Sequence, residues 1–179
     1  MLVTLERMIG LETMNKLIKT YFEKWKFKHP PGKDFIAVAL EVVGKEKGPK
    51  MQETVKSLLN QSIYEASYCD YALTFATSDK KSTGMGIFDE DGERIFKNAE
   101  PLDTYYSSVR VDRKGKMVLP TEIEIIFEDG SKKIIDWDGS DWSKLFEFES
   151  TSPIRIAHID PEQKIYLDID LNNNSFTLQ

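Results

Sequence analysis

The sequence predicts an α+β fold, with an N-terminal layer of three to four helices followed by an antiparallel β-sandwich. Apolar residues recur with helical spacing through residues 1–66. From residue 67 to residue 179, short alternating stretches are separated by turn residues. The segment TEIEIIFEDGSKKIIDWDGSDW, residues 121–142, carries the clearest hairpin signal. We therefore expect two domains, with helices in residues 1–66 and the sandwich in residues 67–179.

Two helices are predicted before residue 27, covering residues 2–9 and 11–26 and separated by Gly10. Because no capping residue precedes the first helix, we expect it to continue from an upstream helix. The second helix has apolar residues at intervals of three and four, which predicts one buried face. The residues expected on that face are Met14, Leu17, Ile18, Tyr21, Phe22 and Trp25.

Two further helices follow the segment His29-Pro30-Pro31-Gly32, which interrupts the helical pattern because proline disfavours helix at the residue before it. Asp34 is predicted to open the first of them and Gly44 to end it. A polar loop over residues 45–49 is then expected before the last helix. Its predicted inward residues are Met51, Val55, Leu58, Leu59 and Ile63.

The central hairpin of the second half alternates apolar Ile123, Ile125 and Phe127 with glutamates, as expected of a strand with one buried face. Asp129-Gly130 then permits a tight turn, and the chain returns towards Trp137. Asp91-Gly92 signals a second hairpin within residues 86–96. Further strands are predicted around Tyr71–Phe75, Tyr105–Val111, Leu145–Phe148, Ile154–Ile159 and Ile165–Ile169.

Composition excludes several classes of partner. The 179 residues carry a net charge of −6, whereas nucleic acids and anionic membranes call for clustered Lys and Arg. The longest apolar run, residues 35–40, is far shorter than a membrane span. The first ten residues also lack the pattern of a signal peptide. We expect no nucleic-acid partner and no membrane span, and the sequence does not indicate a compartment.

A complete catalytic zinc site is not expected. The sequence has two histidines, His29 and His158, whereas a catalytic site typically needs three protein ligands, and the metallopeptidase motif places two histidines one helical turn apart. We interpret His29 as a loop residue and His158 as a strand residue. Cys69 lacks a nearby histidine in sequence and is interpreted as a buried structural thiol rather than a nucleophile.

Two acidic loops, residues 89–93 and 136–141, admit a calcium interpretation, but neither has EF-hand spacing and Asp-Gly is ordinary turn chemistry. An aromatic surface of Trp137, Trp142, Tyr105 and Tyr106 would suit a sugar or peptide, although packing within a sandwich explains the same residues. The triplets beginning at Asn60 and Asn173 match the glycosylation pattern, which matters only in a secreted protein.

The chain carries, in this order, Leu5, Ile9-Gly10, Tyr21-Phe22, Phe27, Asp34-Phe35, Asn60-Gln61 and Tyr64. This order of segments resembles the aminopeptidase N family of gluzincin zinc peptidases. The N-terminal part is similar to the helices that follow the active site in that family. The later segments FEDGSKKIIDWDG and IDPEQKIYLDIDLNNNS look like its C-terminal β-domain.

The resemblance implies that the zinc ligands and the other catalytic residues belong to an upstream part of a larger protein. No catalytic, cofactor-binding or metal-binding residue is therefore assigned in residues 1–179, and zinc is expected only in the parent protein. We expect a non-catalytic scaffold that contacts the upstream catalytic domain and self-associates through uncovered Leu5, Met14 and Leu17. The alternative is a free-standing binding module that uses the region of Trp137 and Trp142.

Overall fold

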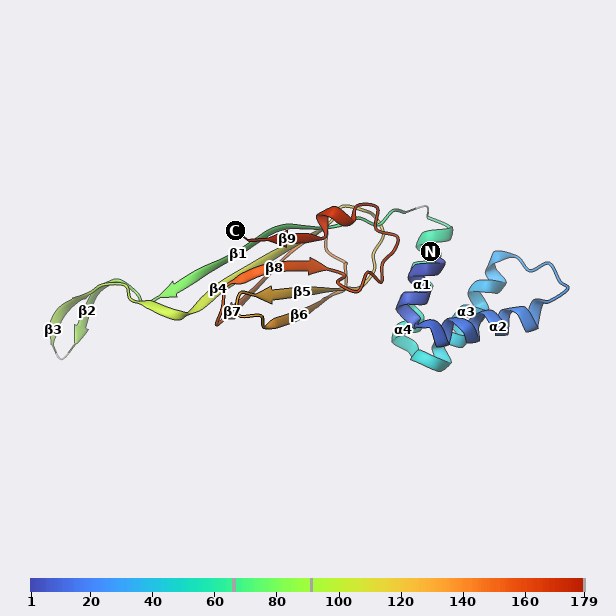
Figure 1. The fold of residues 1–179 in the computed structure, drawn as a ribbon, viewed down its shortest axis with the longest axis horizontal. Helices are drawn as coiled ribbons and strands as arrows, with labels where there is room; N and C mark the ends of the chain where they lie inside the picture. Colours follow the sequence, from blue (N-terminus) through green and yellow to red (C-terminus); the bar gives the residue numbers. More distant parts are fainter. Residues whose placement is uncertain (66, 91, 179) are drawn as a thin grey trace.

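The computed structural model describes residues 1–65, 67–90 and 92–178, and it confirms the α+β class. The molecule is elongated, with a layer of helices at one end, antiparallel sheets in the middle and a two-stranded arm at the far end (Figure 1). No helix in the described ranges is both long and apolar enough to cross a membrane. The predicted order of helices followed by strands is therefore correct.

The helical layer contains four helices, α1 (Leu2–Ile9), α2 (Leu11–Trp25), α3 (Gly32–Lys47) and α4 (Pro49–Ile63). Gly10 separates α1 from α2 with a φ of +83°, a backbone conformation that glycine adopts without steric cost. Helix α2 packs on α3, and α3 packs on α4. Their facing surfaces bury Leu17, Val38 and Leu58 completely.

Helix α3 is longer than predicted, because Gly44 lies inside it rather than at its end. A side chain at Gly44 would collide with Gln52 of α4, whose Nε2 would lie 2.6 Å from an added Cβ. The missing side chain lets the Gln52 amide approach α3 and donate a hydrogen bond to the Leu40 carbonyl at 2.8 Å. Gly44 therefore allows close helix packing, and the predicted loop over residues 45–49 is reduced to Gly48 between the two helices.

Three antiparallel sheets make up the second half (Figure 1). One sheet has the order β1-β4-β7, a second has the order β6-β5-β8-β9, and β2 and β3 form the arm. The strands are β1 (Tyr71–Ser82), β2 (Gly86–Glu90), β3 (Glu93–Lys97), β4 (Pro101–Arg113), β5 (Thr121–Phe127), β6 (Lys132–Trp137), β7 (Ser143–Ser150), β8 (Ile154–Ile159) and β9 (Ser175–Thr177).

Both predicted hairpins are present. In the central one, β5 pairs with β6 in a register that places Thr121 opposite Trp137 and Ile123 opposite Ile135. In the arm, Ile87 lies opposite Phe96. Asp91 of the predicted Asp-Gly turn lies outside the described residues.

The strand predicted at Ile165–Ile169 is wrong. The chain forms turns there, followed by a short 3₁₀ helix (η1, Leu171–Asn173). The Asp160 carboxylate accepts hydrogen bonds from the backbone N–H groups of Lys164 and Ile165 at 2.9 and 2.7 Å. These bonds hold the chain in a turn and replace the ladder that a strand would need. Ile165 is buried, whereas Ile169 is exposed, so the alternating apolar residues do not form one buried strand face.

The helices and the two larger sheets share one hydrophobic cluster, which runs from Leu5 in α1 to Ile123 in β5 and Ile165. Gln61, at the end of α4, holds the helices to the sheets through the backbone of Val118. Its Oε1 accepts from the Val118 N–H at 2.7 Å, and its Nε2 donates to the Val118 carbonyl at 2.9 Å. The helical layer is therefore fixed to the sheets by both apolar packing and polar contacts.

Candidate functional site

The two histidines lie in different parts of the molecule. His29 is exposed in the loop after α2, and His158 is half-buried in β8, where it lies opposite Glu124 of β5. Over residues 1–65, 67–90 and 92–178, no group of three or more His, Cys, Asp or Glu side chains is placed to hold a metal ion. The structure thus brings neither histidine into a ligand cluster.

Cys69 is fully buried, as predicted for a structural thiol. Burial raises the pKa of the thiol strongly, and the neighbouring carboxylates of Asp168 and Asp70 raise it further. Asp168 has a raised pKa of its own, mainly because of burial. Its carboxylate accepts hydrogen bonds from the Tyr71 N–H at 3.2 Å and the Asn174 amide at 3.0 Å. A thiol in this setting stays protonated and is a poor nucleophile.

The acidic loop over residues 136–141 is a hydrogen-bonded turn. The Asp138 carboxylate accepts from the backbone N–H of Ser140 at 3.0 Å and from its hydroxyl at 2.9 Å. These bonds hold the pKa of Asp138 below its ordinary value. In the other acidic loop, Asp89 lies 3.6 Å from Arg94, and Asp91 is outside the described residues. Asp138 and Asp89 are thus engaged with neighbouring backbone or side chains.

Trp137, Trp142, Tyr105 and Tyr106 do not form one exposed aromatic surface. Trp137 is only 2% exposed and packs against the ring of Tyr71, with 5.1 Å between centroids, so packing accounts for this residue and the alternative of a binding surface does not. Tyr106 is exposed and donates a hydrogen bond to Glu147 at 2.6 Å, whereas Tyr105 is half-buried. Trp142 remains 61% exposed.

One face of Trp142 is covered by Arg113, whose guanidinium carbon lies 4.1 Å from the ring centroid. Arg113 is 5% exposed. Its N–H groups donate to the backbone carbonyls of Gly115, Lys116, Gly139 and Ser140. Arg113 therefore connects the loops at this end of the sheets through hydrogen bonds, and its guanidinium lies against the ring of Trp142.

The two glycosylation triplets lie in structured positions. Asn60 is half-buried in α4, next to Gln61, the residue that holds α4 to the sheets. The Asn173 side-chain nitrogen donates to Asp70 and Asp170 at 3.0 and 3.1 Å. Attachment of a glycan to Asn173 would replace one of the two hydrogens on this nitrogen and so remove at least one of these hydrogen bonds.

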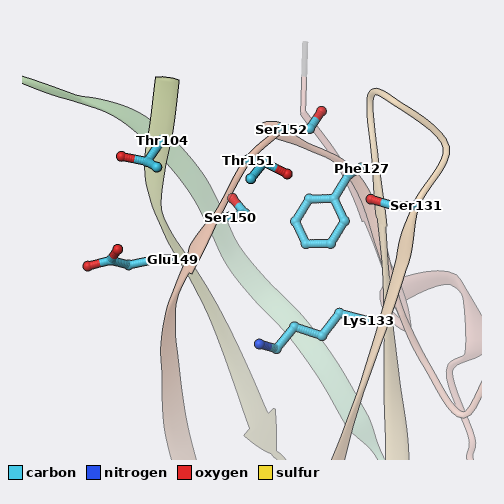
Figure 2. Close-up of a pocket in the computed structure, with 8 residues that line it drawn as sticks. All are labelled: Thr104, Phe127, Ser131, Lys133, Glu149, Ser150, Thr151 and Ser152. Atoms are coloured by element: carbon cyan, nitrogen blue, oxygen red, sulfur yellow. The ribbon is translucent and has the colours of Figure 1, made fainter. Parts of the chain in front are cut away.

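A hollow of about 410 Å³ lies where the edges of the two sheets part, between β6 and β7 (Figure 2). The ring of Phe127 stands at its centre, and Lys133 extends under it from β6, whereas the Glu149 carboxylate points away. Hydroxyls line the rest of the hollow: Thr104, Ser131, Ser150, Thr151 and Ser152.

Most polar groups of this hollow already have partners. The Lys133 ammonium lies 4.6 Å from the centroid of the Phe148 ring, and the Glu149 carboxylate accepts from Lys81 at 2.7 Å. Ser152 accepts a hydrogen bond from the Asp129 backbone N–H at 3.2 Å. These contacts make the hollow a seam between the sheets rather than a site with convergent free groups.

Helix α2 carries a row of exposed apolar residues. Leu11, Ile18 and Phe22, spaced seven and four residues apart, fall on one helix face and are 63%, 44% and 60% exposed. We call these three residues the outer stripe. The prediction that Leu5, Met14 and Leu17 would be uncovered was wrong, since they are 0%, 7% and 0% exposed.

The sequence did not predict that the outer stripe is exposed, because α2 is apolar on two adjacent faces. The buried face carries Met14, Leu17 and the half-buried Tyr21, and Tyr21 packs edge-on against Phe35 of α3. Ile18 and Phe22 adjoin these positions in the pattern and were therefore assigned to the same face. The unusually wide apolar arc of α2 was the available signal.

A comparison of the chain with known protein families and with curated proteins found no match.

Proposed function

We propose that this chain is a non-catalytic scaffold that packs against a separate catalytic domain. The outer stripe of α2 is the observation that carries this proposal. The resemblance to gluzincin aminopeptidases suggests the identity of that domain, a zinc metallopeptidase in which the zinc and the catalytic groups belong to the upstream part. In such a parent, the metal-bound water would attack a peptide carbonyl, and this chain would supply structural support.

The outer stripe suits a permanent contact better than open solvent. Burying one leucine, isoleucine or phenylalanine side chain is worth about 1.5–3 kcal/mol, so a domain that covers all three would gain several kcal/mol. The helix that carries the outer stripe is held in place on its other side, where Thr13, Met14 and Leu17 are buried. A docked domain would therefore meet a pre-formed helix face.

Sedimentation tests this role of the outer stripe. We expect the wild-type chain to self-associate as its concentration rises and to bind the dye ANS. The double variant Ile18→Lys with Phe22→Lys should stay monomeric, with a melting temperature within about 2 °C of the wild type, because both residues are exposed.

The matched control is Ile134→Lys, which replaces a 52% exposed residue of β6 outside the stripe and should leave association unchanged. A wild-type chain that is monomeric and binds no ANS would count against the stripe as a docking face. Strong destabilisation by the double variant would show instead that the stripe is part of the chain's own core.

Two measurements test the link to a peptidase. The purified chain should not hydrolyse amino-acid amides of a fluorogenic amine, and chelator-sensitive hydrolysis would overturn the scaffold role. The coding region upstream of the Met1 codon should encode, in frame, a His-Glu-x-x-His segment and a later glutamate. A stop codon there would remove the peptidase parent and leave the outer stripe as a docking face for another partner.

A further inference from the structure

The arm formed by β2 and β3 carries two exposed apolar side chains on one face, and we call this pair the arm face. Its members are Ile87 of β2 and Phe96 of β3, which are 69% and 59% exposed. They lie opposite each other in the β2-β3 register, so both side chains are on the same side of the ribbon. Among the described residues, the sheet of the arm contains these two strands alone. A two-stranded hairpin is marginally stable in water by itself, so the arm gains stability from a surface that covers it.

The opposite face of the arm is better protected. Phe88 and Ile95 are also cross-strand partners, and they are 41% and 40% exposed. The Lys97 ammonium lies 5.8 Å from the centroid of the Phe88 ring and covers part of it. The arm face is therefore the side of the arm that removes more apolar surface from water when a partner docks.

The arm and the outer stripe are at opposite ends of the molecule, with the two larger sheets between them (Figure 1). The arm therefore does not cover the outer stripe of its own chain. A contact between the two surfaces joins two copies of the chain head to tail. Such a contact leaves one arm and one outer stripe free on the pair.

The two surfaces match in length. Leu11 and Phe22 are eleven positions apart in α2, which at about 1.5 Å per residue spans roughly 17 Å. Strand β2 runs from Gly86 to Glu90, and Met85, which is 68% exposed, precedes it. At about 3.3 Å per residue, the segment from Met85 to Glu90 also spans roughly 17 Å. Helix α2 can therefore lie along the ribbon over the full length of the outer stripe.

The two surfaces also differ in charge. Residues 16–33, from the middle of α2 to the start of α3, contain six lysines and one glutamate. Lys19, Lys28 and Lys33 are exposed and have no acidic partner in the described parts of the chain. Residues 85–97 of the arm contain four acidic and two basic residues. The lysines near one outer stripe attract the acidic arm and repel the lysines near a second stripe, so charge favours the arm as the partner.

We propose that the arm of one copy docks on the outer stripe of a second copy, with the arm face against Ile18 and Phe22. This inference rests on the outer stripe being a docking face, as proposed above, and it names the arm of a second copy as the occupant in the free chain. A catalytic domain on the outer stripe would exclude the arm, so the two contacts compete. Association through arm and stripe continues end to end, because each added copy brings a free arm or a free stripe.

A mixture of two variants is the direct test. The arm variant, Ile87→Lys with Phe96→Lys, keeps an intact outer stripe, and the stripe variant, Ile18→Lys with Phe22→Lys, keeps an intact arm. In sedimentation velocity each variant alone should be monomeric, because each lacks one half of the contact. Their equimolar mixture should form a dimer with one copy of each and grow no further, because the arm and the stripe left over are the substituted ones. The mixture is informative even if the lysines unfold the arm, because the arm variant contributes only its stripe.

The matched control is Phe88→Lys with Ile95→Lys, which changes the other face of the arm and should associate like the wild type. If the arm variant alone associates like the wild type, the arm is overturned as the partner and the outer stripe stands as a docking face. A wild-type chain that is monomeric at every concentration would overturn the docking face and this inference together. A mixture of the two variants that stays monomeric, while the wild type associates, would overturn the contact between arm and stripe.

Salt tests the charge pairing that selects the arm. Association of the wild type should weaken several-fold as sodium chloride is raised from about 0.05 M to about 0.5 M, because salt screens the attraction between the lysines and the acidic arm. Association that is unchanged over this range would overturn the choice of the arm over a second stripe.

Discussion

The contact between Gln61 and Val118 provides the sharpest test of how the helices are held to the sheets. Gln61 is 7% exposed, and its amide makes two hydrogen bonds with the Val118 backbone across the junction. Gln61→Met keeps the length of the side chain and removes both bonds. At about 1 kcal/mol for each bond, the free energy of unfolding should fall by about 2 kcal/mol.

For a chain of this size, such a loss corresponds to about 4–8 °C in melting temperature. Urea unfolding followed by circular dichroism measures the free energy, and hydrogen exchange reports directly on the Val118 N–H, which should lose its protection. The control is Ser57→Ala, which removes the contact of Gln61 with the exposed Ser57 hydroxyl and leaves the Val118 bonds intact. If Gln61→Met changed the free energy of unfolding by less than about 0.5 kcal/mol, with the Val118 N–H still protected, this role of Gln61 would be refuted.

Three further results are expected. Gly139→Ala should lower the free energy of unfolding by about 2 kcal/mol or more, because a Cβ there would lie 2.5 Å from the Leu119 oxygen at a φ of +73°. Gly130→Ala, also at positive φ but in open space, should cost about 1 kcal/mol in the same urea titration. Equal losses for the two variants would contradict the crowding at Gly139. Cys69 should react with a thiol reagent only after unfolding, because burial raises its pKa, and rapid labelling of the native chain would disprove this. Hydrogen bonds from Ser140 lower the pKa of Asp138, so the Asp138 carboxylate stabilises the fold above the ordinary value of 3.8, and this stability is lost as pH falls through the lowered pKa. The difference in urea midpoint between the wild type and Asp138→Ala should therefore shrink in acid. A difference that stays constant with pH would argue against the Asp138 turn.

Local patterns predicted the elements well where each segment decides its own structure. The hairpin of β5 and β6 is an example, because the alternation of Ile123, Ile125 and Phe127 fixes one buried face and Asp129-Gly130 fixes the turn. Gly10 likewise separates two helices in both the prediction and the structure. In these cases propensity and burial point to the same answer.

The pattern failed where side chains from elsewhere in the chain took over. The pattern predicted that Gly44 ends a helix. Gly44 instead lies inside α3, where the absence of a side chain lets Gln52 of α4 approach closely. The alternating residues from Ile165 to Ile169 read as a strand, but the Asp160 carboxylate captures the backbone N–H groups that a ladder would use. Neither partner can be identified from the local sequence.

The candidate sites followed the same division. The sequence predicted that Cys69 is a buried thiol and that His29 lies in a loop, because no histidine is near Cys69 in sequence and a pair of prolines follows His29. It did not reveal the hollow between β6 and β7, because Thr104, Phe127 and Ser150 come from three strands that meet only in the folded chain. It left two interpretations of Trp137 open, packing or a binding surface, and the structure decides for packing because the ring lies against Tyr71.

The sequence by itself determined the α+β class, the order of helices before strands and the central hairpin, because these follow from the period of apolar residues along a short segment. Only the tertiary structure decided which apolar faces are covered. It buried Leu5, Met14 and Leu17 and left Leu11 and Phe22 exposed. A helical period shows that a face is apolar, but the free energy of burial depends on whether another element lies against that face.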